Sequence, residues 1–285
     1  MQKFMSPKSI DELCQALARK DEDTYVIAGG TDLIIHFNKN GIFDYSVIDI
    51  TKLDELKEII ETDTEIIIGA CVTMTEIENS RVINEYIPAL IDSVRNLGSQ
   101  QIRNRATLGG NIANASQSGD NLTVLFAYNA YIEIIDSKGV KRLNKINDVV
   151  EGLGKNNLRC DEIITKIVIE KYSSKSAFSK IGSRKAVTIS KINCCIKINL
   201  NDEIVDEAIV YFGAVGPKPI KAELIEGKII NRNINDINIR DINDAIYGQI
   251  ECAIPDRSSK HYKKAAAEGL IEDVLKKLRS KTWNS

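Results

Sequence analysis

The chain has 285 residues, which at roughly 150 residues a domain predicts about two domains. Its 43% hydrophobic and 27% charged residues are typical of a soluble globular protein. A net charge of −2 gives no global preference for nucleic acid or for an anionic membrane. No apolar run approaches the ~20 residues that span a bilayer, and polar residues interrupt the first dozen positions. We therefore expect a cytoplasmic globular chain.

Six cysteines and two histidines are scattered along the sequence and exclude several kinds of site. No Cys-x-x-Cys pair is present, so the ligand spacings of zinc ribbons and iron–sulfur proteins are absent. Adjacent Cys194 and Cys195 would point to opposite faces of a strand. His36 and His261 are far apart, which argues against a His-based metal site or a Ser-His-Asp triad. We predict no metal ligands and no catalytic side chains here, and a bound organic cofactor as the source of chemistry.

The first fifty residues predict a helix followed by a βαβ unit. Ser9 and Glu12 have the spacing of a reciprocal capping box. Thr31 or Asp32 would cap a later helix, which Gly41 would end. The predicted elements are a helix over 9–20, a strand over 25–28, a helix over 33–40 and a strand over 47–50.

From about residue 55 to 170, predicted strands outnumber helices, which favours an α+β arrangement. Thr73 and Glu76 form a second capping pair. The predicted elements are a hairpin of 58–61 and 65–69, a helix within 87–97, an apolar segment 122–127, and strands at 131–135, 140–143 and 162–170. The polar, serine-rich residues 171–176 are the predicted domain boundary.

Beyond the boundary the pattern predicts a β-hairpin and then helices. The predicted elements are strands at 192–200 and 205–212, a loop over 213–219, a helical stretch over 222–250 and a locally basic helical region over 258–281.

Two glycine-rich segments are the candidate binding elements. Residues 27–33 place Gly29 and Gly30 between a strand and a helix start, where glycine allows positive φ and a close approach of a ligand. Backbone N–H groups at such a turn can bind a pyrophosphate, although a tight structural turn needs glycine as well. The segment is neither a Rossmann fingerprint nor a P-loop.

The second segment, 107–120, is polar and contains three glycines. An ordinary surface loop accounts for its composition. Arg103 and Arg105 before it and an apolar run after it favour instead a loop held against the core with its N–H groups directed inward. We expect Gly110 at the closest approach to a ligand, with positive φ if the turn requires it. Two such segments favour a large ligand that carries a diphosphate.

These motifs together resemble the FAD-binding subunit of the molybdenum hydroxylases, the family of xanthine dehydrogenase, nicotinate dehydrogenase and carbon monoxide dehydrogenase. The resemblance rests on AGGTDL at 28–33 and QIRNRATLGGNIANASQSGD at 101–120. It extends to three later segments, 178–186, 213–222 and 256–264. The order and spacing of five motifs make the resemblance specific.

The resemblance implies an α+β protein with a vanillyl-alcohol-oxidase (PCMH)-type FAD-binding domain over 1–172. This domain would contain a βαβ subdomain over about 1–55 and a larger α+β subdomain over about 56–172. A small C-terminal domain of antiparallel sheet and helices, of the CO dehydrogenase flavoprotein type, would follow over 177–285. Gln117 and Lys263 stand where the family often has proline and arginine, and we expect Lys263 to contact only the C-terminal helix.

The resemblance also implies the FAD-binding residues. The two glycine segments would hold the diphosphate, Asp120 would meet the adenosine or ribose side, Ile164 would pack on the cofactor, and Lys180 would lie near the flavin. Plain surface exposure is the alternative for Lys180. The implied cofactor-binding residues are Ile27, Ala28, Gly29, Gly30, Thr31, Asp32, Leu33, Thr107, Gly109, Gly110, Asn111, Asp120, Ile164 and Lys180.

The implied function is electron transfer within a hetero-oligomer. A molybdopterin-binding large subunit would act on substrate, a [2Fe–2S] small subunit would relay electrons, and FAD in this chain would pass them to NAD⁺ or another acceptor. Molybdopterin and [2Fe–2S] clusters are expected only in the partner subunits. Two alternatives are a stand-alone FAD-dependent reductase or oxidase of related fold, and a non-catalytic nucleotide-binding module.

Overall fold

A computed structural model describes residues 3–184 and 187–280 of the chain. They form two compact units, and neither is one continuous stretch of sequence. The first unit comprises the described residues of 1–77, 98–115 and 129–171, and the second those of 78–97, 116–128 and 172–285. The predicted domains, 1–172 and 177–285, are continuous stretches of sequence, and these discontinuous units do not test their boundaries. The domain boundaries therefore stay a prediction. Parts of two predicted segments, at 185–186 and 281, lie outside the described residues.

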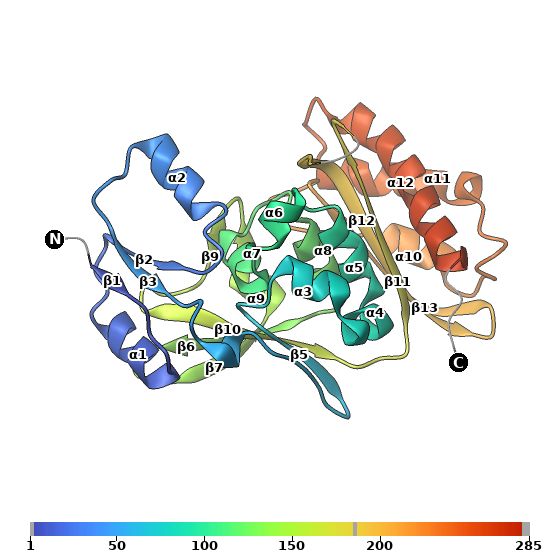
Figure 1. The fold of residues 1–285 in the computed structure, drawn as a ribbon. Helices are drawn as coiled ribbons and strands as arrows, with labels where there is room; N and C mark the ends of the chain where they lie inside the picture. The colour runs from blue at the N-terminus through green and yellow to red at the C-terminus, as the bar shows by residue number, and fades with distance from the viewer. Residues whose placement is uncertain (1–2, 185–186, 281–285) are drawn as a thin grey trace. The chain divides into compact units, whose positions relative to one another are not determined.

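A parallel sheet with strand order β1–β3–β2 belongs to the first unit (Figure 1). Its elements are β1 (Phe4–Met5), α1 (Ile10–Ala18), β2 (Thr24–Ile27), α2 (Leu33–Asn40) and β3 (Ser46–Asp49). The crossover through α2 joins two parallel strands, so the predicted βαβ unit is confirmed. Leu13 and Leu17 of α1 share one buried apolar cluster with Ile48 of β3, which holds the helix on the sheet.

The helix caps of this sheet differ in part from the prediction. The Ser9 hydroxyl accepts a hydrogen bond from the Glu12 N–H at 3.2 Å, but the Glu12 carboxylate accepts from the Lys8 N–H at 2.8 Å instead of from Ser9. Asp32 makes no side-chain cap bond, so its predicted capping role is wrong. Gly41 ends α2 with a φ of 65°, the left-handed conformation that glycine adopts at little cost.

A larger antiparallel sheet with strand order β4–β5–β10–β6–β7 is the centre of the first unit. Its strands are β4 (Ile59–Glu61), β5 (Glu65–Gly69), β6 (Tyr131–Asp136), β7 (Lys141–Lys145) and β10 (Glu162–Glu170). Short elements accompany it: η1 (Asp54–Leu56), α6 (Gln100–Arg103), α7 (Leu108–Asn114), α9 (Ile146–Val149) and the pair β8 (Val150–Gly152) and β9 (Lys155–Asn156). β10 confirms the strand predicted at 162–170. It pairs on both sides and is buried along nearly its whole length.

The capping box predicted at Thr73 and Glu76 is present at α3 (Met74–Asn79). The Thr73 N–H donates to the Glu76 carboxylate at 2.7 Å, and the Glu76 N–H donates to the Thr73 hydroxyl at 3.2 Å. Both bonds are formed within four residues, so the local sequence is sufficient to specify this helix start.

The prediction of a loop over the second glycine segment is wrong. Residues 108–114 form α7, and the segment ends in a second helix, α8 (Asp120–Ala127). Glycine and asparagine are poor helix formers, which conceals α7 in the sequence. The Thr107 hydroxyl caps α7 by accepting from the Gly110 N–H at 3.2 Å. Tertiary packing of Leu108 and Ile112, both fully buried, stabilises the helix despite its weak propensity.

An antiparallel sheet with order β11–β12–β13–β14 organises the second unit. Its strands are β11 (Lys175–Gly182), β12 (Ser190–Asn201), β13 (Ile204–Gly213) and β14 (Ile220–Lys221). Its helices are α4 (Arg81–Tyr86), α5 (Pro88–Arg95), α8, α10 (Glu223–Ile229), α11 (Ile239–Ala253) and α12 (Lys260–Ser280). The predicted hairpin is confirmed as β12–β13. The predicted helical stretch over 222–250 is interrupted, since Asn238 caps a new helix by accepting from the Arg240 N–H.

Helices cover both faces of this sheet. α11 and α12, coloured orange to red in Figure 1, share with β12 a core that contains Ile192, Cys194 and Ile196. The alternate residue Asn193 faces α8, where it accepts a hydrogen bond from Thr123. Cys194 and Cys195 therefore point to opposite faces, as predicted.

The cysteines lead to a prediction about thiol reactivity. Cys160 and Cys252 are exposed, whereas burial raises the pKa of Cys71 to about 12 and raises that of Cys194 well above its ordinary value. The thiolate is the reactive form, so we expect the two exposed thiols to react with dithionitrobenzoate at mildly alkaline pH long before the buried ones. Mass spectrometry of the labelled peptides identifies the sites. Early labelling of Cys71 or Cys194 in the folded protein would contradict the structure.

Candidate functional site

The first glycine segment runs from the end of β2 to the start of α2. Gly30 has a φ of +71°, which favours glycine at this turn. A Cβ on Gly29 would lie 2.0 Å from the Arg105 carbonyl oxygen, so only glycine allows the two segments to approach this closely. The Arg105 side chain also donates to the Gly29 carbonyl at 3.3 Å. The two motifs that the sequence singles out are therefore in direct contact within the first unit.

The start of α2 offers hydrogen-bond donors. The first N–H groups of a helix have no partner inside the helix, and Asp32 does not cap them with its side chain. The earliest backbone bonds at this end run from Ile34 N–H to the Gly30 carbonyl and from His36 N–H to the Asp32 carbonyl. An uncapped helix start after a glycine turn is chemically suited to an anionic group such as a diphosphate.

The first N–H groups of the second glycine segment are already hydrogen-bonded to other parts of the first unit. Leu108 N–H donates to the Val72 carbonyl at 3.0 Å and Gly109 N–H to the Ala70 carbonyl at 2.9 Å. A Cβ on Gly109 would lie 2.6 Å from the Cβ of Ala70, so this glycine serves close packing. Gly110 lies in α7, and its φ is not in the left-handed region. The expected inward row of free N–H groups is thus not present in this segment.

Asn111 contributes a buried polar atom of α7 that is available to a ligand. Its Oδ1 is buried and has no hydrogen-bond partner among the described residues. A buried, unsatisfied side-chain oxygen costs about 1 to 3 kcal/mol, which a polar ligand would remove. Asn111 Oδ1 needs a hydrogen-bond donor and the start of α2 offers donors to an anion. Both belong to the same unit and fit a cofactor such as FAD, which carries hydroxyl and N–H groups as well as phosphates.

A buried ion pair dominates the polar interior of the second unit. Asp120, the first residue of α8, accepts from Lys180 Nζ at 2.7 Å, from Ser190 Oγ at 2.5 Å and from Asn193 Nδ2 at 2.9 Å. The side chains of Asp120 and Lys180 are 6% and 7% exposed. Burial raises the pKa of the Asp120 carboxyl, and the Lys180 ammonium opposes that shift.

This geometry changes how Lys180 and Asp120 are interpreted. The surface-exposed alternative for Lys180 is wrong, because its ammonium is buried against a carboxylate and also donates to the Thr188 carbonyl at 3.0 Å. The resemblance assigns Asp120 and Lys180 to different parts of FAD. The ion pair instead brings the two side chains to one place in the second unit. Their roles toward FAD stay predictions.

The sequence reasoning missed three residues that hold this pair. Ser190 and Asn193 donate to Asp120, and Thr123 donates to Asn193 Oδ1 at 2.7 Å, which orients the amide. Each is a small polar residue within an otherwise apolar segment, and each is buried. Such a residue needs a partner, and this signal could have marked them.

Ile164 occupies a buried position in β10, paired with Ile134 of β6 next to a register shift. Its contact with a cofactor stays a prediction. Within 3–184 and 187–280, no group of three His, Cys, Asp or Glu side chains is arranged to hold a metal ion. No helix in the same described ranges is both long and apolar enough to cross a membrane.

The Asp120–Lys180 pair gives a pH-dependent prediction. At neutral pH, Lys180→Met should lower the free energy of unfolding by about 3 to 5 kcal/mol, because a buried carboxylate loses its cation. Without that cation the folded-state pKa of Asp120 rises further above its unfolded value. The folded variant then binds the proton more tightly than the unfolded chain, and its deficit should shrink as the pH falls through the folded pKa.

Urea unfolding at neutral and mildly acidic pH measures this deficit. The double variant Asp120→Asn with Lys180→Met is the control, since it has no carboxyl to titrate at this site. A deficit for Lys180→Met that is equal at both pH values would contradict the buried pair.

Comparison with known proteins gives a family match over nearly the whole chain. Residues 1–170 match the model described as FAD binding domain in molybdopterin dehydrogenase. Residues 177–278 match the CO dehydrogenase flavoprotein C-terminal domain. The nicotinate dehydrogenase FAD-subunit of Eubacterium barkeri is 31% identical over 283 residues, which cover 95% of this chain and 94% of that protein. The xanthine dehydrogenase FAD-binding subunit of Escherichia coli O157:H7 is 30% identical over 254 residues, 88% of this chain and 87% of that protein.

Solved structures share the fold. A chain of the carbon monoxide dehydrogenase from Hydrogenophaga pseudoflava superimposes with a TM-score of 0.84 at 22% identity, covering 96% of each chain. A chain of the reconstituted CO dehydrogenase from Oligotropha carboxidovorans gives a TM-score of 0.87 at 19% identity, covering 99% of each. The predicted fold of an FAD-binding domain followed by a CO dehydrogenase flavoprotein C-terminal domain is confirmed. The chain belongs to the family of FAD-binding subunits of the molybdopterin dehydrogenases, whose members are oxidoreductases.

Proposed function

We propose that this chain is the FAD-containing electron-transfer subunit of a molybdenum hydroxylase. It takes electrons from the [2Fe–2S] clusters of a small partner subunit and passes them to NAD⁺ or another acceptor, while a molybdopterin-binding large subunit acts on the substrate. FAD, when bound, supplies both one-electron and two-electron redox chemistry. The cytoplasm is the proposed location, and residues 1–172 and 177–285 are the proposed domains.

The unpaired buried oxygen of Asn111 is the observation that carries this proposal. The first N–H groups of α7 are hydrogen-bonded to Val72, Ala70 and Thr107, whereas Asn111 Oδ1 is buried without a partner among the described residues and is left for a ligand. The uncapped start of α2 adds N–H donors and the positive end of a helix dipole in the same unit. The N–H groups at the start of α2 bind and orient the diphosphate of FAD, and Asn111 Oδ1 accepts from a hydroxyl or N–H group of the cofactor. Neither acts as an acid or base.

Asp120 and Lys180 contribute differently. The pair carries no net charge, so Lys180 offers a cofactor less electrostatic stabilisation than an isolated ammonium would. The pair contributes a fixed geometry, because three hydrogen bonds to Asp120 hold the carboxylate and the Lys180 ammonium in place. We assign the pair to the positioning of a polar group of FAD.

The names of relatives support the proposed partners. The glyceraldehyde dehydrogenase of Sulfolobus acidocaldarius has a medium chain that is 26% identical to this protein over 275 residues. A medium chain implies larger and smaller partners in that enzyme. We extend this arrangement to the present chain, with its electrons supplied from outside the polypeptide.

Substitution of Asn111 tests the FAD site directly. Asn111→Leu keeps the side-chain size and removes the unsatisfied oxygen, so we expect the FAD-free protein to be as stable as the wild type or more stable. Affinity for FAD should fall at least about tenfold, the equivalent of one lost hydrogen bond of about 1.4 kcal/mol. FAD titration followed by flavin fluorescence gives the affinity, and urea unfolding gives the stability.

Asn243→Leu is the matched control. Asn243 of α11 also has a buried Oδ1 without a partner among the described residues, but α11 carries none of the residues assigned to FAD. It should change stability in the same direction and leave the affinity for FAD unchanged. Unchanged FAD affinity in Asn111→Leu would remove the site assignment.

Purification tests the electron-transfer role. Neither glycine segment contains cysteine or histidine, so FAD should be bound non-covalently and acid precipitation should release the yellow colour. Native mass spectrometry of the complex from its own cells should show one FAD for each copy of this chain, together with iron–sulfur and molybdenum subunits. A lone chain that turns over a substrate would support the stand-alone reductase, and a protein that never binds FAD would support the nucleotide-binding module.

A further inference from the structure

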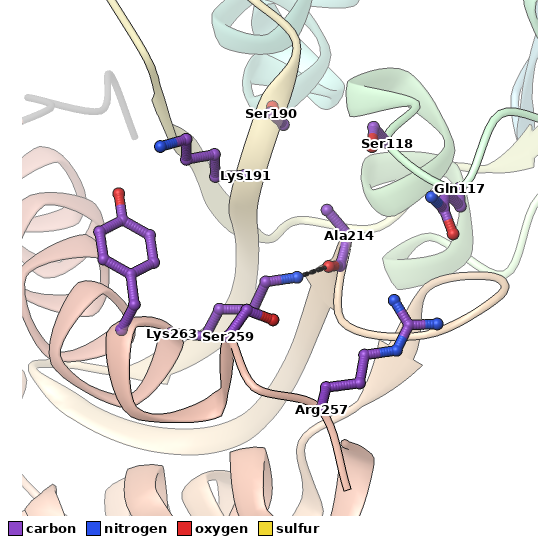
Figure 2. Close-up of a pocket in the computed structure, with 9 residues that line it drawn as sticks. Gln117, Ser118, Ser190, Lys191, Ala214, Arg257, Ser259 and Lys263 are labelled. Atoms are coloured by element: carbon purple, nitrogen blue, oxygen red, sulfur yellow. Dashed lines mark hydrogen bonds between the residues drawn. The ribbon is translucent and has the colours of Figure 1, made fainter.

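A pocket of about 460 Å³ lies within the second unit (Figure 2). Gln117 and Ser118 precede α8 on one side of it, and Ser190 begins β12. Arg257 lies in the turn before α12, and Lys263 lies in the first turn of that helix. The volume falls within the ~300–1,000 Å³ typical of small-molecule sites.

Two of the motifs noted in the sequence meet at this pocket. Lys263 Nζ donates a hydrogen bond to the carbonyl of Ala214, which follows β13. The segments 256–264 and 213–222 are therefore joined here, and the expectation that Lys263 contacts only the C-terminal helix is wrong. Figure 2 shows the Arg257 guanidinium extending from the turn before α12 into the space near Ala214 and Gln117.

The charged side chains that line the pocket are all positive. Lys191, Arg257 and Lys263 line it, and its described lining contains no aspartate or glutamate. Neither Lys191 nor Arg257 forms an ion pair with any described residue. Lys191 lies over the ring of Tyr262 at 5.2 Å, a contact that leaves its positive charge uncompensated. Burial, and secondarily the charge of Arg257, lowers the pKa of Lys263. Lys263 forms no ion pair with a carboxylate among the described residues, and its hydrogen-bond partner is the Ala214 carbonyl.

Neighbouring groups add further hydrogen-bond donors and partial positive charge to the pocket. The pocket lies at the N-terminus of α12, a helix of 21 residues whose dipole places partial positive charge there. Ser118 and Ser259 contribute hydroxyls. Ser190 donates to Asp120, but Lys180 balances that carboxylate, so it does not neutralise the pocket.

We propose that this pocket binds the phosphoryl anion of a small molecule, present either as free phosphate or as the phosphate group of a nucleotide. The Arg257 guanidinium has the planar donor geometry that binds two phosphate oxygens, and the hydroxyls and the helix start supply further donors. The pocket contains Gln117 and Ser118 of the second glycine segment, whereas the groups assigned to the FAD diphosphate, at the start of α2, and Asn111 belong to the first unit. It does not depend on the electron-transfer role.

Binding to the full-length, FAD-loaded chain tests the proposal. Inorganic phosphate, AMP and adenosine are titrated by calorimetry against sodium chloride of equal ionic strength. Phosphate and AMP should bind and adenosine should not, because the phosphoryl group carries the recognition. AMP that binds more tightly than phosphate identifies a nucleotide as the source, and equal or weaker binding identifies free phosphate.

Two variants locate the binding. Arg257→Gln should weaken phosphate binding by about tenfold or more, since a charge-assisted bidentate contact is lost, and Lys191→Gln should weaken it less. Arg257 is exposed and makes no ion pair with a described residue, so its loss should not alter the melting temperature. Lys228→Gln, at an exposed lysine of α10, removes the same charge outside the pocket lining and should leave the affinity unchanged.

Three results would overturn the proposal. One is phosphate binding no stronger than that of chloride. Another is an equal loss of affinity in Lys228→Gln and Arg257→Gln, which would indicate general charge attraction. The third is loss of FAD from Arg257→Gln, which would make the pocket part of the cofactor site. FAD that remains bound in this variant keeps the outcome independent of the proposed function.

Discussion

The buried carboxylate of Asp120 is the constraint on which the second unit depends. An isolated charge in a protein interior is too costly to retain, so every group around it must supply a compensating bond. Lys180 reaches it from β11, and Ser190 and Asn193 reach it from β12. Three bonds from two strands thus fix the first turn of α8 against the sheet. The position of Asn193, which donates to Asp120, in turn requires glycine at 213, because a Cβ there would lie 2.2 Å from Asn193 Oδ1.

In the first unit, close backbone packing holds the segments in place. Gly29 lies against Arg105 and Gly109 against Ala70, at separations that exclude any side chain. Glycine-rich motifs are commonly interpreted as anion-binding turns, but here these two glycines are required for packing whether or not a ligand is present. The groups left for a ligand are their neighbours, the start of α2 and the amide of Asn111. The glycines place these groups and do not themselves provide the contacts.

Features specified by nearby residues were predictable from the sequence, and features specified by distant contacts were not. β10 and the capping box of Thr73 follow from local patterns alone. α7 was missed because its glycines and asparagines disfavour a helix, and burial of Leu108 and Ile112 outweighs that preference. The pair of Asp120 and Lys180 joins positions sixty residues apart, and nothing local indicates it. The family resemblance named both residues without showing that they touch.

The buried charges of the second unit have different kinds of partner, and the partner decides how much electrostatic potential remains around each charge. Asp120 has a full counter-charge in Lys180. Lys197 is 8% exposed and lies over the rings of Tyr128 and Tyr172, at 5.0 and 4.9 Å. Lys263 has a backbone carbonyl, which satisfies one donor but carries only partial negative charge. A carboxylate cancels a positive potential, whereas a carbonyl leaves most of it. The surplus positive potential is therefore at the start of α12, where unpaired cations already gather.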